Sequence, residues 1–427
     1  MKINIVWLRR DLRLEDNTAI YNAINPDFPT LLLFIFDSQI IDDLERDDPR
    51  VNFIYDELEK INTEIKKADS GVLLQKGKPN EIFEKLNADY DINKVFWNHD
   101  YEPYAINRDQ EITTFLEKHG IASESFKDQV IFEGNDVLKD DGKPYTVFSP
   151  FKRKWLKKFT RQHSQELTYS LEELNLLKTD FEFSLKDDIG IQPSEIKVLP
   201  YHLDIVEDYE NIRDKPSING TSLLSPHLRF GTVSVRKIVN YALDRSETFL
   251  SELIWREFFM QILYHFPNTV SSNFKPKYDT VKWRNNEAEF EKWCKGETGY
   301  PIVDAGMKEL NTTGYMHNRV RMIVASFLCK HLLIDWRWGE AYFAKKLLDF
   351  ELSSNVGNWQ WAASTGCDAV PYFRIFNPTS QVKKFDPKMD YIRKWCPEFQ
   401  SLTYPQPIVE HSYARERALD TYKTALS

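Results

Sequence analysis

The stretch TLLLFIFD at residues 30–37 decides the fold, because six consecutive apolar residues make it a compact hydrophobic run. Such a run is typical of a strand buried on both faces of a parallel sheet. Three similar runs indicate further strands: INIVWL at 3–8, GVLLQK at 71–76 and KVFWN at 94–98. Amphipathic stretches that alternate with these runs predict helices at 51–68, 79–87 and 104–119. The alternation predicts a doubly wound, parallel-sheet α/β domain over residues 1–135.

The remaining chain predicts a different architecture. Residues 136–205 include a polar stretch of mixed charge that Pro193 and Pro200 interrupt, and we expect them to form an interdomain connection. From residue 206 to 427 the apolar residues recur mostly at helical spacing, which predicts an all-α second domain. Neither GxGxxG nor GxxxxGK[ST] occurs at the sites where these phosphate-binding motifs are expected, so the first domain lacks the usual nucleotide signals.

Composition limits the class of protein. Hydrophobic residues make up 42% and charged residues 28% of the chain, and no apolar run approaches the roughly 20 residues that span a bilayer. No secretory signal precedes the first strand, so we expect a cytoplasmic protein. The four cysteines are widely spaced and indicate neither a disulfide framework nor a zinc site. A net charge of −9 argues against bulk attraction to nucleic acid, although a local basic face remains compatible with it.

Two helical segments combine charged, amide and aromatic side chains. In SELIWREFF one helix face carries Glu252, Trp255, Arg256 and Phe259. An ordinary ion pair beside a core tryptophan would give the same pattern. In TTGYMHNRVRMIVASF, Asn318, Arg321 and Met322 share a face and Arg319 points elsewhere. Asn318 can bind the edge of a heterocycle and Arg321 a carboxylate or phosphate, but a structural arginine network is equally compatible.

The C-terminal segments leave alternatives open. In NVGNWQWAASTG, Asn355 either caps a helix or contacts a ligand. In PYFRIFNPTSQVKKF, basic Arg374, Lys383 and Lys384 alternate with aromatic residues, which is typical of a nucleic-acid surface and also of a solvated loop. The basic run FKRKWLKKF at 151–159 indicates no more than a solvated helix face. No HExxH, GxSxG or glycosidase-like carboxylate pair points to hydrolysis.

Taken in order, VWLRRDLRLEDN, ELIWREF, TGYPIVDAGM, MHNRVRM, NVGNWQWAASTG and YFRIFNP resemble the motifs of the photolyase and cryptochrome family, most closely the class I enzymes for cyclobutane pyrimidine dimers (CPDs). The resemblance implies an N-terminal antenna domain and a helical domain that holds noncovalent FAD. It further implies a light-dependent carbon–carbon lyase for DNA repair, with UV-damaged DNA as its partner. We expect a monomer without a protein partner.

The resemblance assigns the cofactor residues by position. The flavin pyrophosphate is matched by Tyr209, Thr221, Ser222, Leu223, Leu224 and Ser225. The isoalloxazine ring and its surroundings are matched by Asn318, Arg321, Asp349, Glu351 and Asn355. Asn355 lies where the family contacts flavin N5, and its amide favours a repair enzyme, since plant cryptochromes carry aspartate there and animal cryptochromes usually cysteine. Val356 departs from the second asparagine of many relatives and could alter a hydrogen bond near the flavin.

The resemblance also assigns the residues for lesion binding and for electron transfer by position. Glu252 matches the acid that binds the dimer bases, and Trp255 and Trp361 match the indoles that wedge the flipped lesion. Phosphate contacts are matched by Arg319 and Arg374, with Lys383 nearby. The chain that photoreduces the flavin is matched by Trp283, Trp336 and Trp359.

Three alternative functions stay open. A (6-4) photolyase would place histidines where this chain has Asn318 and Met322, which favours the CPD as substrate. A blue-light sensory cryptochrome usually carries a C-terminal extension, whereas this chain ends shortly after YPQPIVEH. A flavoprotein that binds DNA without repair is the third. An antenna chromophore, whether folate, deazaflavin or flavin, has its candidate loop at His99, Asp100 and Glu102.

Overall fold

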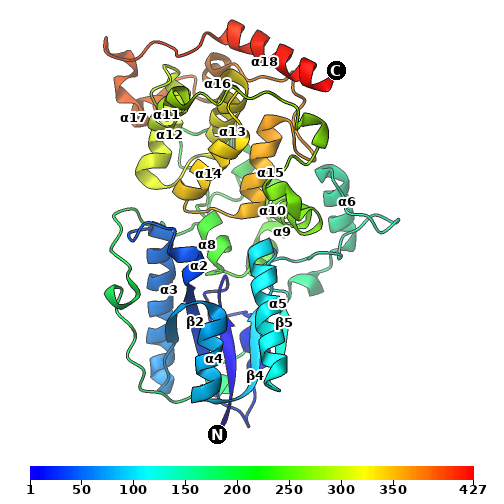
Figure 1. Ribbon diagram of the computed structural model, residues 1–427, viewed down its shortest axis with the longest axis vertical. Helices are drawn as coiled ribbons and strands as arrows, with labels where there is room; N and C mark the ends of the chain where they lie inside the picture. Colours follow the sequence, from blue (N-terminus) through cyan, green and yellow to red (C-terminus); the bar gives the residue numbers. More distant parts are fainter. The chain divides into compact units, whose positions relative to one another are not determined.

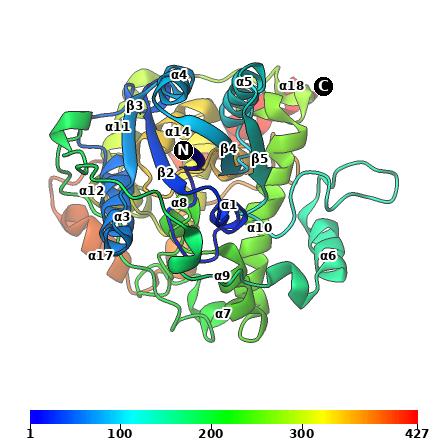
Figure 2. The same ribbon diagram turned by 90° about the horizontal axis from the view of Figure 1, so that it is seen from below.

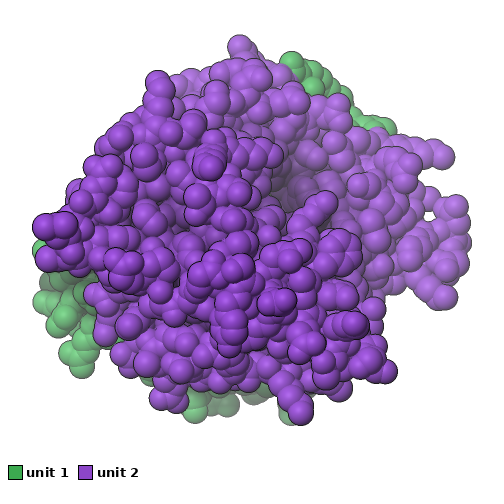
Figure 3. Space-filling model, turned by 90° about the horizontal axis from the view of Figure 1, so that it is seen from above, with its two compact units in different colours: residues 1–133, 158–201, 223–244 green, residues 134–157, 202–222, 245–427 purple.

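The computed structural model describes residues 1–427, which form two compact units interleaved in sequence (Figures 1 and 3). Unit 1 comprises Met1–Glu133, Lys158–Tyr201 and Leu223–Asp244. Unit 2 comprises Gly134–Lys157, His202–Ser222 and Arg245–Ser427. None of the helices combines the length and the apolar composition that a membrane crossing requires.

Unit 1 is built on a five-stranded parallel sheet with the strand order β3-β2-β1-β4-β5. Its strands are β1 (Lys2–Leu8), β2 (Thr30–Asp37), β3 (Leu73–Gly77), β4 (Asp91–Asn98) and β5 (Ala122–Phe126). The predicted α/β fold is confirmed, and the four apolar runs form β1 to β4. The fifth strand was not predicted, because ASESF is polar and lies at the sheet edge with little burial.

Helices cover both faces of the sheet (Figure 2). They are α1 (Thr18–Ala23), α3 (Pro49–Ile65), α4 (Pro79–Asp89) and α5 (Pro103–Lys118), with the short α2 (Ser38–Ile41) after β2. Val6 enters the core that α1 and α3 cover, whereas its neighbours Ile5 and Trp7 enter the core under α4 and α5. Burial on both faces explains why the strand sequences are continuous apolar runs.

Two helices from the middle of the chain also belong to unit 1: α8 (Ser225–Phe230) and α9 (Val235–Leu243). Gly231 ends α8 with a φ of 66°, and a Cβ there would lie 2.1 Å from the carbonyl oxygen of Arg10. Arg236 of α9 pairs with Asp16 at 2.8 Å and with Asp128 at 2.9 Å, and all three side chains are buried. These contacts tie α9 to the loop after β1.

Unit 2 is helical, as predicted. Its helices are α6 (Phe148–Lys158), α7 (Tyr209–Ile212), α10 (Glu247–His265), α11 (Glu287–Lys295), α12 (Pro301–Thr313), α13 (Asn318–Ser326), α14 (Trp336–Lys346), α15 (Leu352–Ala363), α16 (Pro378–Phe385), α17 (Asp390–Trp395) and α18 (His411–Leu426). A π-helical turn, Phe327–His331, follows α13 directly. One large apolar core, which includes the fully buried Trp293 and Trp336, holds α11 to α15 together.

Candidate active site

Helix α10 carries two of the predicted lesion contacts, Glu252 and Trp255. The helix begins at Ser246, whose side chain accepts a hydrogen bond from the N–H of Phe249. The Glu252 carboxylate pairs with the guanidinium of Arg213 at 2.6 Å. Burial raises the pKa of Glu252, and the charge of Arg213 opposes that rise. The structure therefore holds Glu252 as a half-buried acid with a fixed cationic partner.

Helix α13 carries the next group of predicted residues. Its N-cap is His317, whose side chain accepts a hydrogen bond from the N–H of Arg319 at 3.1 Å. Arg319 pairs with Asp214 at 2.6 Å, and its Nη1 lies 3.4 Å from Sδ of Met322. The expectation that Arg319 points away from Met322 was wrong, because residues three apart are neighbours on a helix surface.

Arg213 and Asp214, which no sequence pattern singled out, join α10 to α13. Arg213 pairs with Glu252, and the next residue, Asp214, pairs with Arg319. Because the two partners are adjacent in the chain, the predicted base contact Glu252 and the predicted phosphate contact Arg319 lie at one place in unit 2. The only local signal of this link was the dipeptide Arg213–Asp214 itself, and nothing in its sequence identifies its partners.

Helix α15 contains Asn355 in its interior. The N-cap is Glu351, whose carboxylate accepts hydrogen bonds from the N–H groups of Ser353 and Ser354 at 3.1 and 2.9 Å. The capping interpretation of Asn355 was therefore wrong, since the helix starts three residues before it. The Asn355 side chain is buried, and its Nδ2 donates to the backbone oxygen of Glu340 at 3.1 Å and to its Oε1 at 2.8 Å. These bonds leave Oδ1 as the amide atom that can accept from a ligand.

Two other predicted flavin residues form an ion pair. Arg321 donates to both carboxylate oxygens of Asp349, at 3.1 and 2.9 Å, and its Nε donates to the carbonyl oxygen of Met316 at 2.8 Å. This two-point geometry fixes the plane of the guanidinium. Asn318, the first residue of α13, is exposed.

The three predicted electron-transfer tryptophans all border the large core of unit 2. Trp336 and Trp359 are fully buried, and Trp283 is partly buried against the same cluster. The indole N–H of Trp336 donates to Asn273 at 2.9 Å. A further buried indole, Trp293, lies with its ring centroid 6.1 Å from that of Trp359. The sequence reasoning missed Trp293, because no helical pattern distinguishes it from an ordinary core residue.

The residues predicted to contact the DNA are more accessible to solvent than the buried tryptophans. Trp361 is half-buried, in contrast to the buried Trp359 two residues earlier. Arg374, in the loop after α15, and Lys383, on α16, are exposed. Both cations are therefore free of the apolar core and face solvent, where a phosphate can reach them.

The predicted pyrophosphate residues fall on both sides of the division between units. Tyr209, Thr221 and Ser222 belong to unit 2, whereas Leu223, Leu224 and Ser225 belong to unit 1. Leu223 has a φ of 54°, an uncommon left-handed conformation for a residue with a side chain. Burial raises the pKa of Tyr209 to about 12, so its phenol is neutral at physiological pH.

The candidate antenna loop follows β4 in unit 1. His99 contacts Glu133 and Ser125, each at 2.9 Å. Asp100 and Glu102 both pair with Arg10 at 3.0 Å. Although burial alone would raise the pKa of Asp100, the guanidinium of Arg10 lowers it. These side chains are held by protein partners in this structure.

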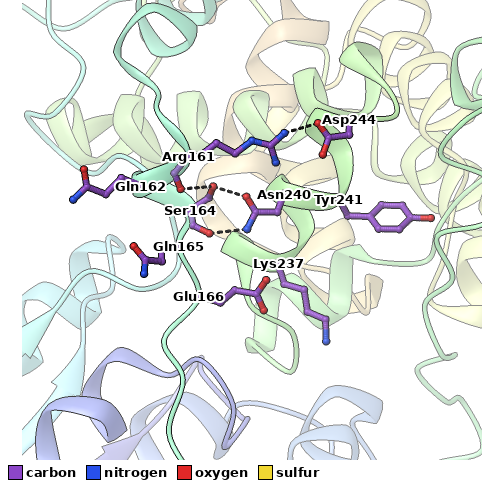
Figure 4. A pocket seen from close by; sticks show the side chains of 9 residues that line it. All are labelled: Arg161, Gln162, Ser164, Gln165, Glu166, Lys237, Asn240, Tyr241 and Asp244. Atoms are coloured by element: carbon purple, nitrogen blue, oxygen red, sulfur yellow. Dashed lines mark hydrogen bonds and ion pairs between the residues drawn. The ribbon is translucent and has the colours of Figure 1, made fainter.

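A surface hollow of about 790 Å³ in unit 1 contains none of the predicted site residues. Polar and charged residues line it, and the side chains of Arg161 and Asp244 pair at its rim (Figure 4). The face of unit 2 drawn in Figure 3 also shows a hollow surrounded by its own atoms. Val356, predicted to influence the flavin, is buried and lines a small, largely apolar cavity together with Phe259 and Gly357.

Comparisons with known proteins identify relatives along the whole chain. Residues 4–169 match the family model described as DNA photolyase, and residues 249–403 match the FAD binding domain of DNA photolyase. A deoxyribodipyrimidine photo-lyase of Escherichia coli is 36% identical, over 100% of this chain and 99% of the relative. A bacterial class III photolyase structure from Agrobacterium tumefaciens is similar with a TM-score of 0.89 and 33% identity, covering 100% of this chain and 98% of the other. An archaeal photolyase structure from Sulfolobus tokodaii with two FAD molecules has a TM-score of 0.80 and 32% identity, covering 99% of each chain.

Proposed function

The chain belongs to the DNA photolyase family, and on that premise we propose that it is a deoxyribodipyrimidine photo-lyase that splits CPDs in DNA under light. The observation that carries this proposal is the Arg213–Asp214 link, which joins Glu252 and Arg319 at one place in unit 2. A flipped base is read by hydrogen bonds to its edge and its backbone is held through phosphate contacts, and an acid beside a cation can supply one contact of each kind.

FAD is the cofactor. When bound in its reduced form, it would supply the light-driven electron transfer that opens the dimer. We assign its ring contacts to Asn318, Arg321, Asp349, Glu351 and Asn355. The donor set fits this group, because Glu340 orients the Asn355 amide with Oδ1 left to accept from the flavin N5–H. We assign the pyrophosphate to Tyr209, Thr221, Ser222, Leu223, Leu224 and Ser225.

In this proposal Glu252 hydrogen-bonds the flipped dimer, while Trp255 and Trp361 hold it by stacking. Burial raises the pKa of Glu252, and the ion pair with Arg213 opposes that rise. Extruding a damaged pair costs only a few kcal/mol, so the pocket selects lesions that already stack poorly. Asn318 and Met322 form the part of the pocket that separates CPDs from (6-4) photoproducts.

The backbone of the DNA is assigned to Arg319, Arg374 and Lys383. Arg374 and Lys383 are exposed and can meet a phosphate directly, whereas Arg319 must exchange Asp214 for it. Trp283, Trp336 and Trp359 are assigned to photoreduction of an oxidised flavin. They take no part in the repair of a dimer by the reduced enzyme.

Substrate selectivity tests the proposal. Duplexes that contain one CPD, one (6-4) photoproduct or no lesion are incubated with the reduced holoprotein, in light and in darkness. We expect repair of the CPD in light alone and no repair of the (6-4) product. Light-dependent repair of the (6-4) product instead would assign the chain to that class, and binding of damaged DNA without any repair would favour a flavoprotein that binds DNA without repairing it.

The antenna chromophore, the cellular location and the oligomeric state are further proposals. We propose a second, antenna chromophore of the folate, deazaflavin or flavin type, which the second FAD of the Sulfolobus tokodaii relative supports by analogy. Extraction and mass spectrometry of the native holoprotein would identify it. We also propose a cytoplasmic monomer, which light scattering and cell fractionation would test.

A further inference from the structure

Helix α6 contains the basic run to which no function was assigned, and three of its side chains contact α10. The Trp155 indole donates to the buried carboxylate of Glu257 at 2.6 Å. Lys152 pairs with Glu247 at 2.9 Å, near the start of α10. These two side-chain contacts join α6 to α10. They help to fix the position of the first turn of α6 relative to the middle of α10.

The first turn of α6 places an aromatic ring flat on Trp255. The ring centroids of Phe148 and Trp255 are 3.6 Å apart, and the two planes differ by 8°. Phe148 is buried, and its ring also meets Phe258 edge to face with the centroids 5.8 Å apart. Trp255 is half-buried. Phe259, one turn further along α10, also packs on Trp255, with the ring centroids 5.5 Å apart and the planes 26° apart. The Trp255 indole is therefore restrained by two neighbouring rings, of which Phe148 is the nearer and the more nearly parallel.

The backbone of Phe148 is bound to a second lesion-side segment. Its N–H donates to Oδ2 of Asp368 at 3.0 Å. Asp368 lies in the loop between α15, which carries Trp361, and the exposed Arg374. A single residue thus contacts the indole on α10 through its ring and the loop after α15 through its amide.

We propose that Phe148 is a positioning residue for lesion recognition: it stacks on Trp255, restrains the orientation of the indole that meets the dimer, and couples Trp255 to the Arg374 loop through Asp368. The inference rests on the proposed function, in which Trp255 stacks on the lesion. Face-to-face contact restricts rotation of the indole, so less conformational entropy is lost when the dimer binds. Phe148 acts through Trp255 and does not itself touch DNA.

Phe148→Leu removes the flat ring while it keeps a buried apolar side chain. The matched control is Phe151→Leu in the next turn, because Phe151 is equally buried and packs on Phe258, with ring centroids 5.3 Å apart, but has no ring contact with Trp255. Phe148→Tyr retains the stack. For each variant, FAD content and the melting temperature establish that the holoprotein is folded.

The measurement is the ratio of Kd for undamaged DNA to Kd for a CPD duplex, at one fixed salt concentration. We expect Phe148→Leu to lower this ratio about fivefold, within the range of an aromatic pair, and Phe148→Tyr and Phe151→Leu to change it less than about twofold. The fluorine resonance of 5-fluorotryptophan, assigned to position 255 with Trp255→Phe, should shift in Phe148→Leu and return in Phe148→Tyr.

The outcomes separate the proposed function from the proposed positioning role of Phe148. If the wild-type protein shows no preference for CPD duplexes, the proposed function fails. If the wild type discriminates and Phe148→Leu keeps the same ratio and the same resonance, the positioning role is wrong while the function stands. An equal loss in Phe151→Leu would also overturn it, since that result would make the effect a general one of core packing.

Discussion

Among single residues, Glu252 has the sharpest predicted role. Replacing Glu252 by Ala removes the base contact and leaves Arg213 without its partner, so we expect the light-driven repair rate at saturating DNA to fall about tenfold or more. Kd for the CPD duplex should rise by less than this factor, because the stacking and phosphate contacts remain.

Glu252→Gln is the matched control, since it keeps the shape and a hydrogen-bonding amide. Repair should be less impaired than in Glu252→Ala. Single-turnover repair and fluorescence anisotropy separate the two effects, and an unchanged repair rate in Glu252→Ala would remove Glu252 from the pocket.

Trp283 tests the electron path. We expect Trp283→Phe to slow photoreduction of the oxidised flavin by about tenfold or more, because phenylalanine is far harder to oxidise than an indole, while repair by chemically reduced enzyme stays at the wild-type rate. Flash photolysis with an added reductant measures the first rate. Normal photoreduction in this variant would show that electrons enter by another route, for which the buried Trp293 beside Trp359 offers a starting point.

The sequence motifs predicted which types of residue lie together in the site. They did not predict which other residues of the chain these site residues contact. The spacing in SELIWREFF placed Glu252 and Trp255 on one helix face. The partners Arg213 and Phe148 come from segments 39 and more residues away, and no local pattern reports such contacts. The assignments to FAD and DNA came from the resemblance, and they stay predictions until variants are measured.

At the scale of helices, the N-cap of α13 makes stability depend on pH. Burial lowers the pKa of His317 to about 4, from an ordinary value near 6.5. Between pH 4 and 6.5 the unfolded chain binds a proton that the folded protein excludes, so stability falls as the pH falls through this window.

His317→Asn keeps a side chain that can cap the helix and removes the titrating group. We expect the pH dependence of the unfolding free energy between pH 4 and 6.5 to become flatter by roughly 3 kcal/mol over the window. Denaturant melts of wild type and variant at matched pH measure this difference. Parallel pH profiles would mean that the pKa of His317 is the same in the folded and unfolded states.

Helix boundaries show where sequence patterns stop being informative. The helical spacing of the second domain predicts ordinary α-helix, but the structure contains α13, which ends at Ser326, and then a π-helical turn. A π turn adds one residue per turn without changing which side chains are apolar, so the pattern cannot distinguish it. The edge strand β5 was missed for the opposite reason, because its side chains are mostly polar.

The charge of the whole molecule bears on DNA binding. With a net charge of −9, the protein depends on local cations such as Arg374 and Lys383 to hold a phosphate backbone. We expect Arg374→Ala to weaken binding of damaged and undamaged DNA by similar factors and to reduce the slope of log Kd against log salt by about 1. Binding titrations at four salt concentrations measure the slope. A change confined to damaged DNA would place Arg374 at the lesion itself.

The two-part architecture was predictable in outline, since alternating apolar runs and helical spacing separate the α/β half from the helical half. The expected borders at 135 and 205 stay a prediction. The interleaving of the units depends on contacts such as Arg236 with Asp16, which are 220 residues apart in the chain and leave no local signal. The class I assignment also stays a prediction, and a class III structure is among the relatives.

The most direct test of the account is a single-turnover flash experiment on the reduced holoprotein bound to a thymine-dimer oligonucleotide. We predict that the ultraviolet absorbance of the two thymines returns after the flash, that the flavin ends in the reduced state in which it began, and that nothing changes in darkness. Intact dimers after illumination of the bound, reduced complex would contradict the account.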